Sequence, residues 1–453
     1  MWRLEDIVRA TGGTVLKKDK EIFTNISTDS RTIGPDEFFV PILGKSFDGH
    51  AFIEKALARS LGGTLSRADH RVSFADTPGT IVLVEDTNQA LLDLARFRRQ
   101  TLTGKVICIT GSNGKTTTKE ILVSMMKKRY TVHYNEKNLN NLIGVPLSML
   151  SITGNPEITI MELGTNMPGE IKKLAITCEP EMSLITNVNP SHLEGLFSME
   201  GILEEKLDIF RYTKNDGTLF VNADDPALAS RYREIGCQAV TFGIEREADW
   251  RLGITRDLGW EGSEFQIATP AGIIAARTSL LGVHNHYNIL AAAAIAAAAG
   301  VDHPDIVSAI EEFHSYDKRF EPQPSSKGYM IIDDTYNANP SSMQWAIKTL
   351  ESLPARGKKV AILGGMKELG DQSAHYHREI GSILKSAHDI GLVLLLGEET
   401  LDTFSEAGNG KARHFLDRDE LIEYAQSHLK SGDTVLVKGS RAFRMEEIVE
   451  ALA

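Results

Sequence analysis

A glycine-rich run between an apolar segment and a helix-like segment is the strongest chemical signal in this sequence. The run Thr110-Gly-Ser-Asn-Gly-Lys-Thr116 follows the apolar residues 106–110 and precedes the helix-like residues 119–128. A strand, a glycine-rich turn and a helix in this order are typical of a phosphate-binding loop, whose backbone N–H groups close around phosphate oxygens. We therefore expect Lys115 to neutralise the outer phosphates and the Thr116 hydroxyl to ligate Mg²⁺.

This loop departs from the usual pattern at one position, because Ile109 stands where a further glycine is expected. The sequence therefore predicts a variant site for a nucleoside triphosphate. The predicted nucleotide-binding residues of the loop are Thr110, Gly111, Ser112, Asn113, Gly114, Lys115 and Thr116.

Two further polar side chains follow apolar runs. Glu162 lies at the end of the run 158–163, and His192 follows the run 182–188. The carboxyl ends of parallel strands meet at one sheet edge, where open α/β sheets bind ligands. A buried glutamate there needs a cation, either a structural partner or a metal ion. A loop histidine alone would be an ordinary surface group, but beside Thr116 and Glu162 it becomes a candidate ligand for a second Mg²⁺.

Apolar runs that alternate with helix-length segments must position these residues. The runs are 106–110, 158–163, 182–188 and 218–222, and, farther on, 330–333, 359–363, 391–396 and 434–438. Such alternation predicts α/β architecture with mostly parallel sheets covered by helices on both faces. The last four runs indicate a smaller Rossmann-like unit.

The N-terminal region differs from this pattern. Short strands are expected at 37–41 and 79–85, with helices near 52–60 and 89–101. An alanine-rich helix at 288–299 precedes a second change of pattern near Tyr316. A chain of 453 residues is also long enough for about three domains. We expect them at residues 1–102, 103–315 and 316–453.

Composition limits the classes of partner. The chain has 49 Lys and Arg against 61 Asp and Glu, a formal net charge of −12, so it lacks the basic field that nucleic acids and anionic membranes attract. Three cysteines cannot form a disulfide framework. No signal peptide is recognisable, and the apolar run 289–299 is too short to span a bilayer. We expect a cytoplasmic monomer without membrane insertion.

The residues above, with others in the same order, resemble the Mur ligases of peptidoglycan synthesis along nearly the whole chain. The matching motifs are the phosphate loop, the run Asn138-Leu-Asn-Asn-Leu-Ile-Gly-Val-Pro146, Glu162-Leu-Gly-Thr, Gly169-Glu-Ile, His192-Leu-Glu, Gly282-Val-His-Asn-His-Tyr-Asn288-Ile-Leu-Ala and Lys318-Arg319-Phe-Glu. Near the N-terminus, Ser27-Thr-Asp-Ser30-Arg31 and Phe47-Asp-Gly-His-Ala-Phe52 resemble the UDP-binding domain of the family.

Two motifs narrow the resemblance to the family members that add D-alanyl-D-alanine. They are Asp333-Asp-Thr-Tyr-Asn-Ala-Asn-Pro-Ser-Ser-Met343 and Gly364-Gly-Met-Lys-Glu-Leu-Gly370. The Asp-Asn-Pro-Arg motif expected of the ligases that add lysine or diaminopimelate is missing from the sequence. The resemblance implies that ATP phosphorylates the terminal carboxylate of a UDP-N-acetylmuramoyl-tripeptide and that the amine of D-alanyl-D-alanine attacks the resulting acyl phosphate. It further implies that the last domain closes over the site to exclude water.

The resemblance also assigns roles to individual residues. It implies catalytic roles for Lys115, Glu162, His192, Lys206 and Arg319. Two Mg²⁺ ions would be held by Thr116, Glu162, His192 and a carbamylated Lys206. ATP would be contacted by Asn288, Arg319, Asp334 and Asn337 as well as by the phosphate loop. The UDP-sugar would be bound by Ser30, Arg31, Asn138 and Asn141, and Lys438 would help to bind the dipeptide or the acyl phosphate.

Lys206 lies in the one motif that differs from the family. Members often carry Ala-Lys-Gly-Glu around the modified lysine, whereas this chain has Glu205-Lys-Leu-Asp208. From the residues alone, Lys206 would be read as a solvated lysine on a charged helix. Its role as a carbamate therefore rests on the resemblance.

Three other functions remain as alternatives. The first is another amino-acid-adding ligase, such as a folylpolyglutamate ligase, although the UDP-type N-terminal domain argues against it. The second is a P-loop kinase that phosphorylates a hydroxyl group. The third is a non-enzymatic nucleotide-binding scaffold, which would have little need for Glu162, His192 and Asp334 together.

Overall fold

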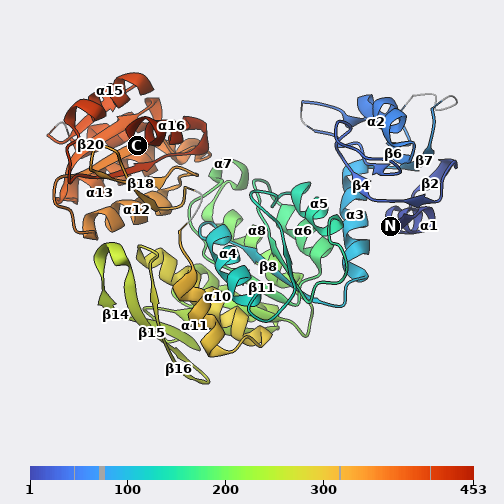
Figure 1. Cartoon of the computed structure of the whole chain (residues 1–453), viewed down its shortest axis with the longest axis horizontal. Helices are drawn as coiled ribbons and strands as arrows, with labels where there is room; N and C mark the ends of the chain where they lie inside the picture. The colour runs from blue at the N-terminus through green and yellow to red at the C-terminus, as the bar shows by residue number, and fades with distance from the viewer. Residues whose placement is uncertain (45, 71–76, 316–317, 409) are drawn as a thin grey trace.

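The computed structural model describes residues 1–44, 46–70, 77–315, 318–408 and 410–453. Three lobes follow one another along the longest axis of the molecule, and the N-terminus and C-terminus lie in opposite end lobes (Figure 1). We call the elements before α3 the N-terminal lobe, those from α3 to α11 the central lobe, and those from β17 onward the C-terminal lobe.

The N-terminal lobe is built on a five-stranded sheet in the order β2-β7-β6-β5-β4. Within this sheet β2 and β7 pair antiparallel and the other neighbouring strands pair parallel, whereas β1 and β3 form a separate antiparallel pair. The elements of the lobe are β1 (Trp2–Arg3), α1 (Leu4–Thr11), β2 (Thr14–Lys17), β3 (Ile22–Phe23), β4 (Ile26–Ser27), β5 (Phe38–Phe39), α2 (Ile53–Ser60), β6 (Gly63–Arg67) and β7 (Thr80–Val84). The strand expected at residues 37–41 is therefore only two residues long.

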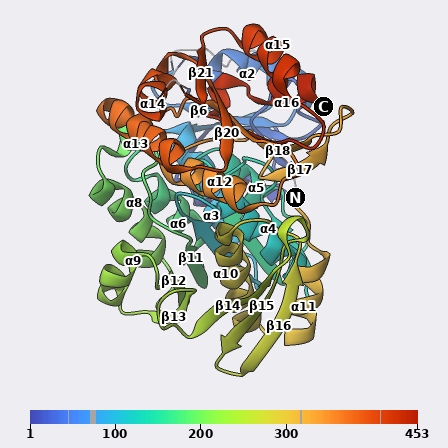
Figure 2. The ribbon, with the colours of Figure 1, turned by 90° about the vertical axis from the view of Figure 1, so that its left-hand side faces the viewer.

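The central lobe contains a nine-stranded sheet in the order β16-β15-β14-β13-β12-β11-β8-β10-β9. Its strands are β8 (Lys105–Thr110), β9 (Val132–Tyr134), β10 (Ile158–Glu162), β11 (Met182–Ile185), β12 (Thr218–Asn222), β13 (Gln238–Gly243), β14 (Trp250–Asp257), β15 (Ser263–Thr269) and β16 (Gly272–Thr278). The strands from β9 to β14 are parallel, as expected. The antiparallel ladder β14-β15-β16 was not predicted. In Figure 2 it extends away from the C-terminal lobe.

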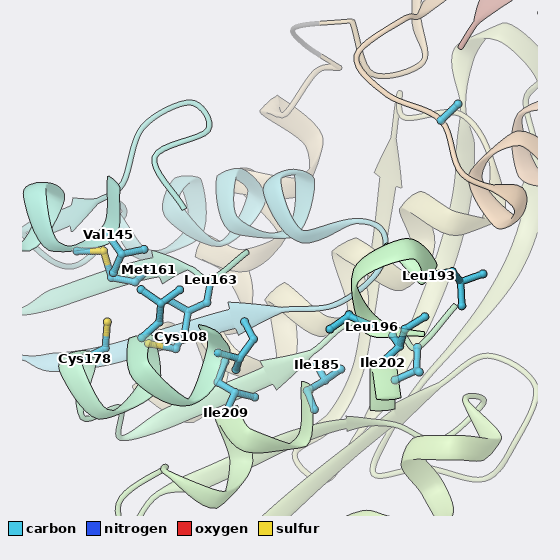
Figure 3. Close-up of a cluster of buried hydrophobic side chains, with 14 of the residues drawn as sticks. Cys108, Val145, Met161, Leu163, Cys178, Ile185, Leu193, Leu196, Ile202 and Ile209 are labelled. Carbon is cyan, nitrogen blue, oxygen red and sulfur yellow. The ribbon is translucent and has the colours of Figure 1, made fainter. Parts of the chain in front are cut away.

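Helices cover both faces of this sheet. They are α3 (Thr87–Gln100), α4 (Lys115–Met126), α5 (Gly144–Leu150), α6 (Glu170–Cys178), α7 (Leu193–Leu196), α8 (Met199–Arg211), α9 (Pro226–Arg231), α10 (Val283–Ala299) and α11 (His303–Glu312). Cys108 of β8 packs in one core with Ile209 of α8, whereas its neighbour Ile109 packs in another core with α4 and α10. Figure 3 shows Cys108 beside strand and helix side chains of the first core. Burial on both faces explains why β8 is apolar without alternation.

The C-terminal lobe has a six-stranded sheet in the order β17-β18-β22-β19-β20-β21, in which only β17 is antiparallel to its neighbour. Its strands are β17 (Glu321–Pro324), β18 (Met330–Asp334), β19 (Lys359–Gly364), β20 (Ile390–Leu396), β21 (Ala412–Phe415) and β22 (Thr434–Lys438). Its helices are α12 (Pro340–Ser352), α13 (Ser373–Ser386), α14 (Leu401–Ala407), α15 (Arg418–His428) and α16 (Glu446–Leu452). This is the Rossmann-like arrangement that the sequence predicted.

Two helix boundaries differ from the expected ones. The helix after the phosphate loop begins at Lys115 rather than at residue 119, and the alanine-rich helix begins at Val283 rather than at residue 288. Polar side chains in both first turns hid these helical residues from a pattern based on apolar spacing. The boundary predicted near Tyr316 lies outside the described residues. Among the described helices, none is both long enough and apolar enough to cross a membrane.

Candidate active site

A cavity of about 1560 Å³ is lined by residues of all three lobes. Most of the predicted site residues lie on its wall, namely Ser112, Asn113, Gly114, Lys115, Thr116, Asn138, Asn141, Glu162, His192, Asn288, Arg319, Asp334, Asn337 and Lys438. Five predicted residues are not on the wall, namely Ser30, Arg31, Thr110, Gly111 and Lys206. Chain segments far apart in the sequence therefore meet around one space large enough for extended substrates.

The phosphate loop connects the end of β8 with the start of α4. Gly111 and Gly114 have φ angles of 148° and 80°, which favour glycine. A Cβ atom at Gly111 would lie 1.9 Å from Thr186 Oγ1, and one at Gly114 would lie 2.2 Å from Asn288 Oδ1. Asn288 therefore contacts the loop directly. The first-turn N–H groups of α4 have no partner within the helix, so this end of the helix can bind an anion.

Lys115 folds back over the loop, and its Nζ donates a hydrogen bond to Gly111 O at 2.8 Å. Burial lowers the pKa of the Lys115 amine; the carboxylate of Glu162 opposes this shift and the guanidinium of Arg319 adds to it. A phosphate anion that displaced the carbonyl contact would find a desolvated ammonium group, which strengthens the electrostatic interaction.

Glu162 ends β10 and is only 2% exposed. Its Oε1 accepts a hydrogen bond from Asn140 Nδ2 at 2.8 Å. Its Oε2 is buried and has no hydrogen-bond partner among the described residues. Asn135 holds the backbone of Glu162 on both sides, because its side chain donates to Glu162 O and accepts from Glu162 N. One oxygen of a rigidly held carboxylate is thus left for a cation.

Arg319 reaches the phosphate loop from the start of the C-terminal lobe. Its Nη2 donates to Thr116 Oγ1 at 3.0 Å, and its guanidinium lies 4.0 Å from the ring centroid of Tyr336. A second contact joins the same two regions, because Asn339 Nδ2 donates to Asn113 Oδ1 at 2.7 Å. The C-terminal lobe therefore rests directly on the loop.

Asp334 and Lys438 form a pair at the ends of β18 and β22. Lys438 is 2% exposed, and its Nζ donates to Asp334 Oδ2 at 2.7 Å and to Asn337 O at 2.9 Å. Burial raises the pKa of Asp334, and the Lys438 ammonium opposes this shift. The amide oxygen of Asn337 accepts from Ala338 N at 2.9 Å. Lys438 therefore lines the cavity and also holds Asp334 and Asn337 in place.

His192 directly precedes the short helix α7, and Lys206 follows this helix in the sequence. His192 has a φ angle of 53°, and its Nδ1 lies 2.6 Å from Glu368 Oε2 of the C-terminal lobe. Lys206 lies on α8 and is 1% exposed. Burial, with a smaller contribution from the Lys115 ammonium, lowers the pKa of Lys206 to about 7, while Glu205 acts in the opposite direction.

The predicted UDP-sugar residues fall into two groups. Asn138 and Asn141 line the cavity, and Asn141 Oδ1 also accepts from Gly144 N at 2.8 Å at the start of α5. Ser30 and Arg31 lie in the N-terminal lobe away from the cavity wall, where Arg31 Nη2 pairs with Asp29 Oδ2 at 2.8 Å. That guanidinium lowers the pKa of Asp29 to about 2. The N-terminal lobe contributes residues 42–44 to the cavity wall. Helix α3 and the residue that caps it contribute Asn88 and Asp86.

Four residues with structural roles at the site were not singled out from the sequence. Asn140 contacts Glu162, and Glu205 contacts the loop that follows β10. Asn339 contacts the phosphate loop, and Glu368 contacts His192. Asn140, Asn339 and Glu368 lie in motifs used for the resemblance, but their partners are distant in the sequence. Among the described residues, no group of three or more His, Cys, Asp or Glu side chains is placed to hold a metal ion.

Comparison with known proteins connects this geometry with one family. Residues 109–296 match the Mur ligase middle domain, and residues 318–441 match the family described as "Mur ligase, glutamate ligase domain". The UDP-N-acetylmuramoyl-tripeptide--D-alanyl-D-alanine ligase of Bacillus subtilis (strain 168) is 34% identical over 459 residues, which cover 99% of this chain and 98% of that protein. The ligase of the same name from Escherichia coli (strain K12) is 33% identical, with 94% and 93% covered.

Solved structures agree with this result. A crystal structure of MurF from Acinetobacter baumannii matches with a TM-score of 0.91 and 30% identity, covering 100% of this chain and 98% of that one. MurF ligase from Thermotoga maritima in complex with ADP matches with a TM-score of 0.84 and 29% identity, covering 94% and 96%. The similarity extends over the full length of the chain, and the phosphate loop contacts Arg319. The chain therefore belongs to the Mur ligase family.

Proposed function

We propose that this chain is an ATP-dependent ligase that joins D-alanyl-D-alanine to UDP-N-acetylmuramoyl-tripeptide and releases ADP and phosphate. The observation that carries the proposal is the single cavity in which the phosphate loop, the Glu162 carboxylate and Arg319 meet. Relatives that carry this activity in their names cover nearly the whole chain. We further propose that residues 1–102 bind the UDP-sugar, residues 103–315 bind ATP and residues 316–453 bind the dipeptide, in the cytoplasm.

The donor set around Glu162 fits Mg²⁺. Glu162 Oε2 is a buried carboxylate oxygen without a partner among the described residues, and Mg²⁺ prefers such hard oxygen ligands. Thr116 adds a hydroxyl oxygen and His192 an imidazole nitrogen on the same cavity wall. These three residues, with Lys206 as its carbamate, would hold two ions. When bound, the ions would neutralise phosphate charge during transfer.

Carbamylation of Lys206 is supported by its surroundings. The reaction joins a neutral amine to CO₂ and releases one proton, so it requires a lysine that is not permanently protonated. Burial lowers the pKa of Lys206 to about 7, which leaves a substantial neutral fraction at neutral pH. The carbamate would replace a cation by an anion close to Lys115, which removes the repulsion between two buried ammonium groups.

The residues of the chain then divide the reaction between them. Lys115 and the start of α4 hold the phosphates of ATP, and Arg319 reaches them from the C-terminal lobe, so that the γ-phosphoryl group faces the peptide carboxylate. Attack by the carboxylate oxygen forms an acyl phosphate and frees ADP. The amine of D-alanyl-D-alanine attacks the acyl carbon, loses a proton, and expels phosphate as the amide forms. Arg319 and Asn339 join the C-terminal lobe to the loop, and this lobe would shield the acyl phosphate from water.

Phosphate release tests this function directly. The purified chain is incubated with ATP and a panel of UDP-N-acetylmuramoyl-peptides, with and without D-alanyl-D-alanine. Phosphate release is measured, and the products are identified by mass spectrometry. We expect the pentapeptide product and stoichiometric ADP only when the tripeptide and the dipeptide are both present. Release of ADP with a phosphorylated hydroxyl product, or with another amine at a higher kcat/KM, would contradict the proposal.

A further inference from the structure

Glu368 is a residue for which the proposed reaction has so far no use. It lies in the loop between β19 and the 3₁₀ turn Gly370–Gln372 of the C-terminal lobe. Its carboxylate oxygen Oε2 lies 2.6 Å from His192 Nδ1 of the central lobe. Next to this contact, Glu194 N donates to Glu368 O at 3.1 Å. Side chain and backbone of Glu368 thus both contact the segment that carries His192.

Both partners of this contact have unusual backbone conformations. His192 has a φ angle of 53° and Glu368 one of 63°, in the left-handed region that residues with a side chain rarely adopt. Each such residue costs on the order of 1 kcal/mol, so the conformation persists only where its surroundings hold it. The loops are therefore built to present these two side chains.

Hydrogen bonds hold both loops from behind. On the C-terminal side, Met366 N donates to His377 Nε2 at 3.1 Å and Lys367 N donates to Ser440 Oγ at 2.9 Å. His377 and Ser440 are 1% and 3% exposed. On the central side, Ser191 Oγ donates to Ser112 Oγ of the phosphate loop at 3.0 Å. The contact therefore links two rigid supports, one of which is the phosphate loop.

The contact between Glu368 and His192 is better suited to orienting the His192 ring than to stabilising the fold. The side chains of His192 and Glu368 are 21% and 52% exposed, and ion pairs with such exposure contribute about 0–1 kcal/mol. A carboxylate can only accept, so the neutral imidazole of His192 that fits this contact carries its proton on Nδ1 and leaves Nε2 as the atom for a ligand. Metal-binding histidines in proteins typically donate their second N–H group to such a carboxylate, which fixes the ring and raises its basicity.

We propose that Glu368 is a positioning residue for His192, supplied by the C-terminal lobe when this lobe rests on the central lobe. The carboxylate selects the tautomer and the orientation in which His192 can bind a divalent cation. Docking of the C-terminal lobe therefore completes the metal site as well as covering it. The inference rests on the proposed function in one respect, because it takes His192 as a metal ligand.

Binding of Mn²⁺ to the full chain tests this inference without relying on activity. Free Mn²⁺ is measured by electron paramagnetic resonance in the presence of a non-hydrolysable ATP analogue, for wild type, Glu368→Ala, Glu368→Gln, His192→Ala and the double variant. Asp371→Ala, an exposed carboxylate three residues farther on, is the matched control. We expect Glu368→Ala to weaken Mn²⁺ binding about 10-fold or more, and Glu368→Gln, which keeps an acceptor oxygen, to weaken it less.

The double variant distinguishes positioning from a general structural effect. If Glu368 acts through His192, Glu368→Ala causes no further loss in the His192→Ala background. Wild-type Mn²⁺ affinity in both Glu368 variants, or an additive loss in the double variant, would overturn the inference. Pentapeptide formation by the wild type is measured on the same preparation. A failure of that assay with intact coupling would count against the proposed function alone.

Discussion

Lys206 shows how burial changes the chemistry of a single residue. On α8 it lies between Glu205 and the apolar Leu207, and 1% of it is exposed. A charged amine at such a position is costly, so its environment favours either the neutral amine or a modified form. The low pKa and the position near Lys115 are both consistent with carbamylation.

Substitution of Lys206 tests this role. We expect Lys206→Ala to lower kcat by at least about 100-fold, because the anionic ligand proposed for the site would be lost. A short carboxylate such as formate or acetate should restore part of the activity of this variant but not that of Lys115→Ala. Lys128→Ala, at a lysine paired with Glu312 on the surface, should retain wild-type activity. Full activity of Lys206→Ala without added carboxylate would disprove the role.

His286 predicts a dependence of stability on pH. It is 5% exposed, its Nε2 lies 2.6 Å from Ser263 Oγ, and burial lowers its pKa to about 4. In the unfolded chain His286 binds a proton near pH 6.5, whereas in the folded chain it does so only near pH 4. Protonation of the unfolded chain therefore lowers the free energy of unfolding as the pH falls from 6.5 towards 4, and has no effect above pH 6.5. The loss amounts to at most about 3 kcal/mol.

Urea unfolding at pH 7.5 and at pH 4.5 measures this effect. The difference between the two pH values should be smaller for His286→Gln than for the wild type, whereas His388→Gln, at an exposed position, should behave like the wild type. Equal pH dependence in all three proteins would show that His286 does not contribute.

At the scale of elements, the loop between β10 and α6 depends on a carboxylate from another helix. Glu205 of α8 is 5% exposed and accepts from Thr165 Oγ1 at 2.9 Å, from Gly169 N at 2.6 Å and from Ile171 N at 2.7 Å. It thus satisfies the orphan N–H groups at the start of α6. The same side chain fixes α8 beside the cavity wall, one residue before Lys206.

Removal of this carboxylate should loosen the loop. We expect Glu205→Ala to lower the free energy of unfolding by about 2–4 kcal/mol, because three donors lose a charged acceptor. Hydrogen exchange should increase locally at residues 164–171. The adjacent Glu204→Ala is the matched control, since Glu204 pairs with Arg211 and Arg231 on the surface and should cost less than about 1 kcal/mol. Similar losses in the two variants would contradict the assignment.

At the scale of the whole molecule, the C-terminal lobe contacts the central lobe at points around the cavity. Arg319 with Thr116, Asn339 with Asn113, and Glu368 with His192 are polar contacts, and each involves a residue proposed to bind nucleotide or metal. Such contacts form and break more readily than a large apolar interface. We therefore expect the lobes to separate to admit substrates and to close for reaction.

Asn339→Asp separates docking from helix stability. Asn339 Oδ1 accepts from Ser342 N at 2.9 Å and caps α12, and aspartate caps equally well. The donor to Asn113 is lost, worth about 1 kcal/mol, and a negative charge is added beside the phosphate loop, so we expect KM for ATP to rise about 5-fold or more at an unchanged melting temperature. Small-angle scattering with an ATP analogue should show a less compact variant. A large loss of stability, or an unchanged KM, would contradict this interpretation.

Local sequence patterns determined much of the fold. Apolar runs such as 106–110 and 359–363 became strands close to their predicted bounds, because a strand buried on both faces must be apolar throughout. The glycines of the phosphate loop were recognisable because only glycine tolerates the backbone angles there. The ladder β14-β15-β16 was not predicted because it contains no continuous apolar run. The last five residues of β14 are exposed, and in β15 and β16 buried residues alternate with exposed ones, as is typical of strands that are buried on one face.

The tertiary structure alone decided which side chains meet. Glu368 and His192 are 176 residues apart, and neither carries a local signal that names the other. The burial of Lys206 and the free oxygen of Glu162 depend on helices packed from elsewhere in the chain. Ser30 and Arg31 are not on the cavity wall, and their contact with the UDP-sugar stays a prediction. Spacing along the chain determines local conformation, whereas solvation and contact depend on the whole fold.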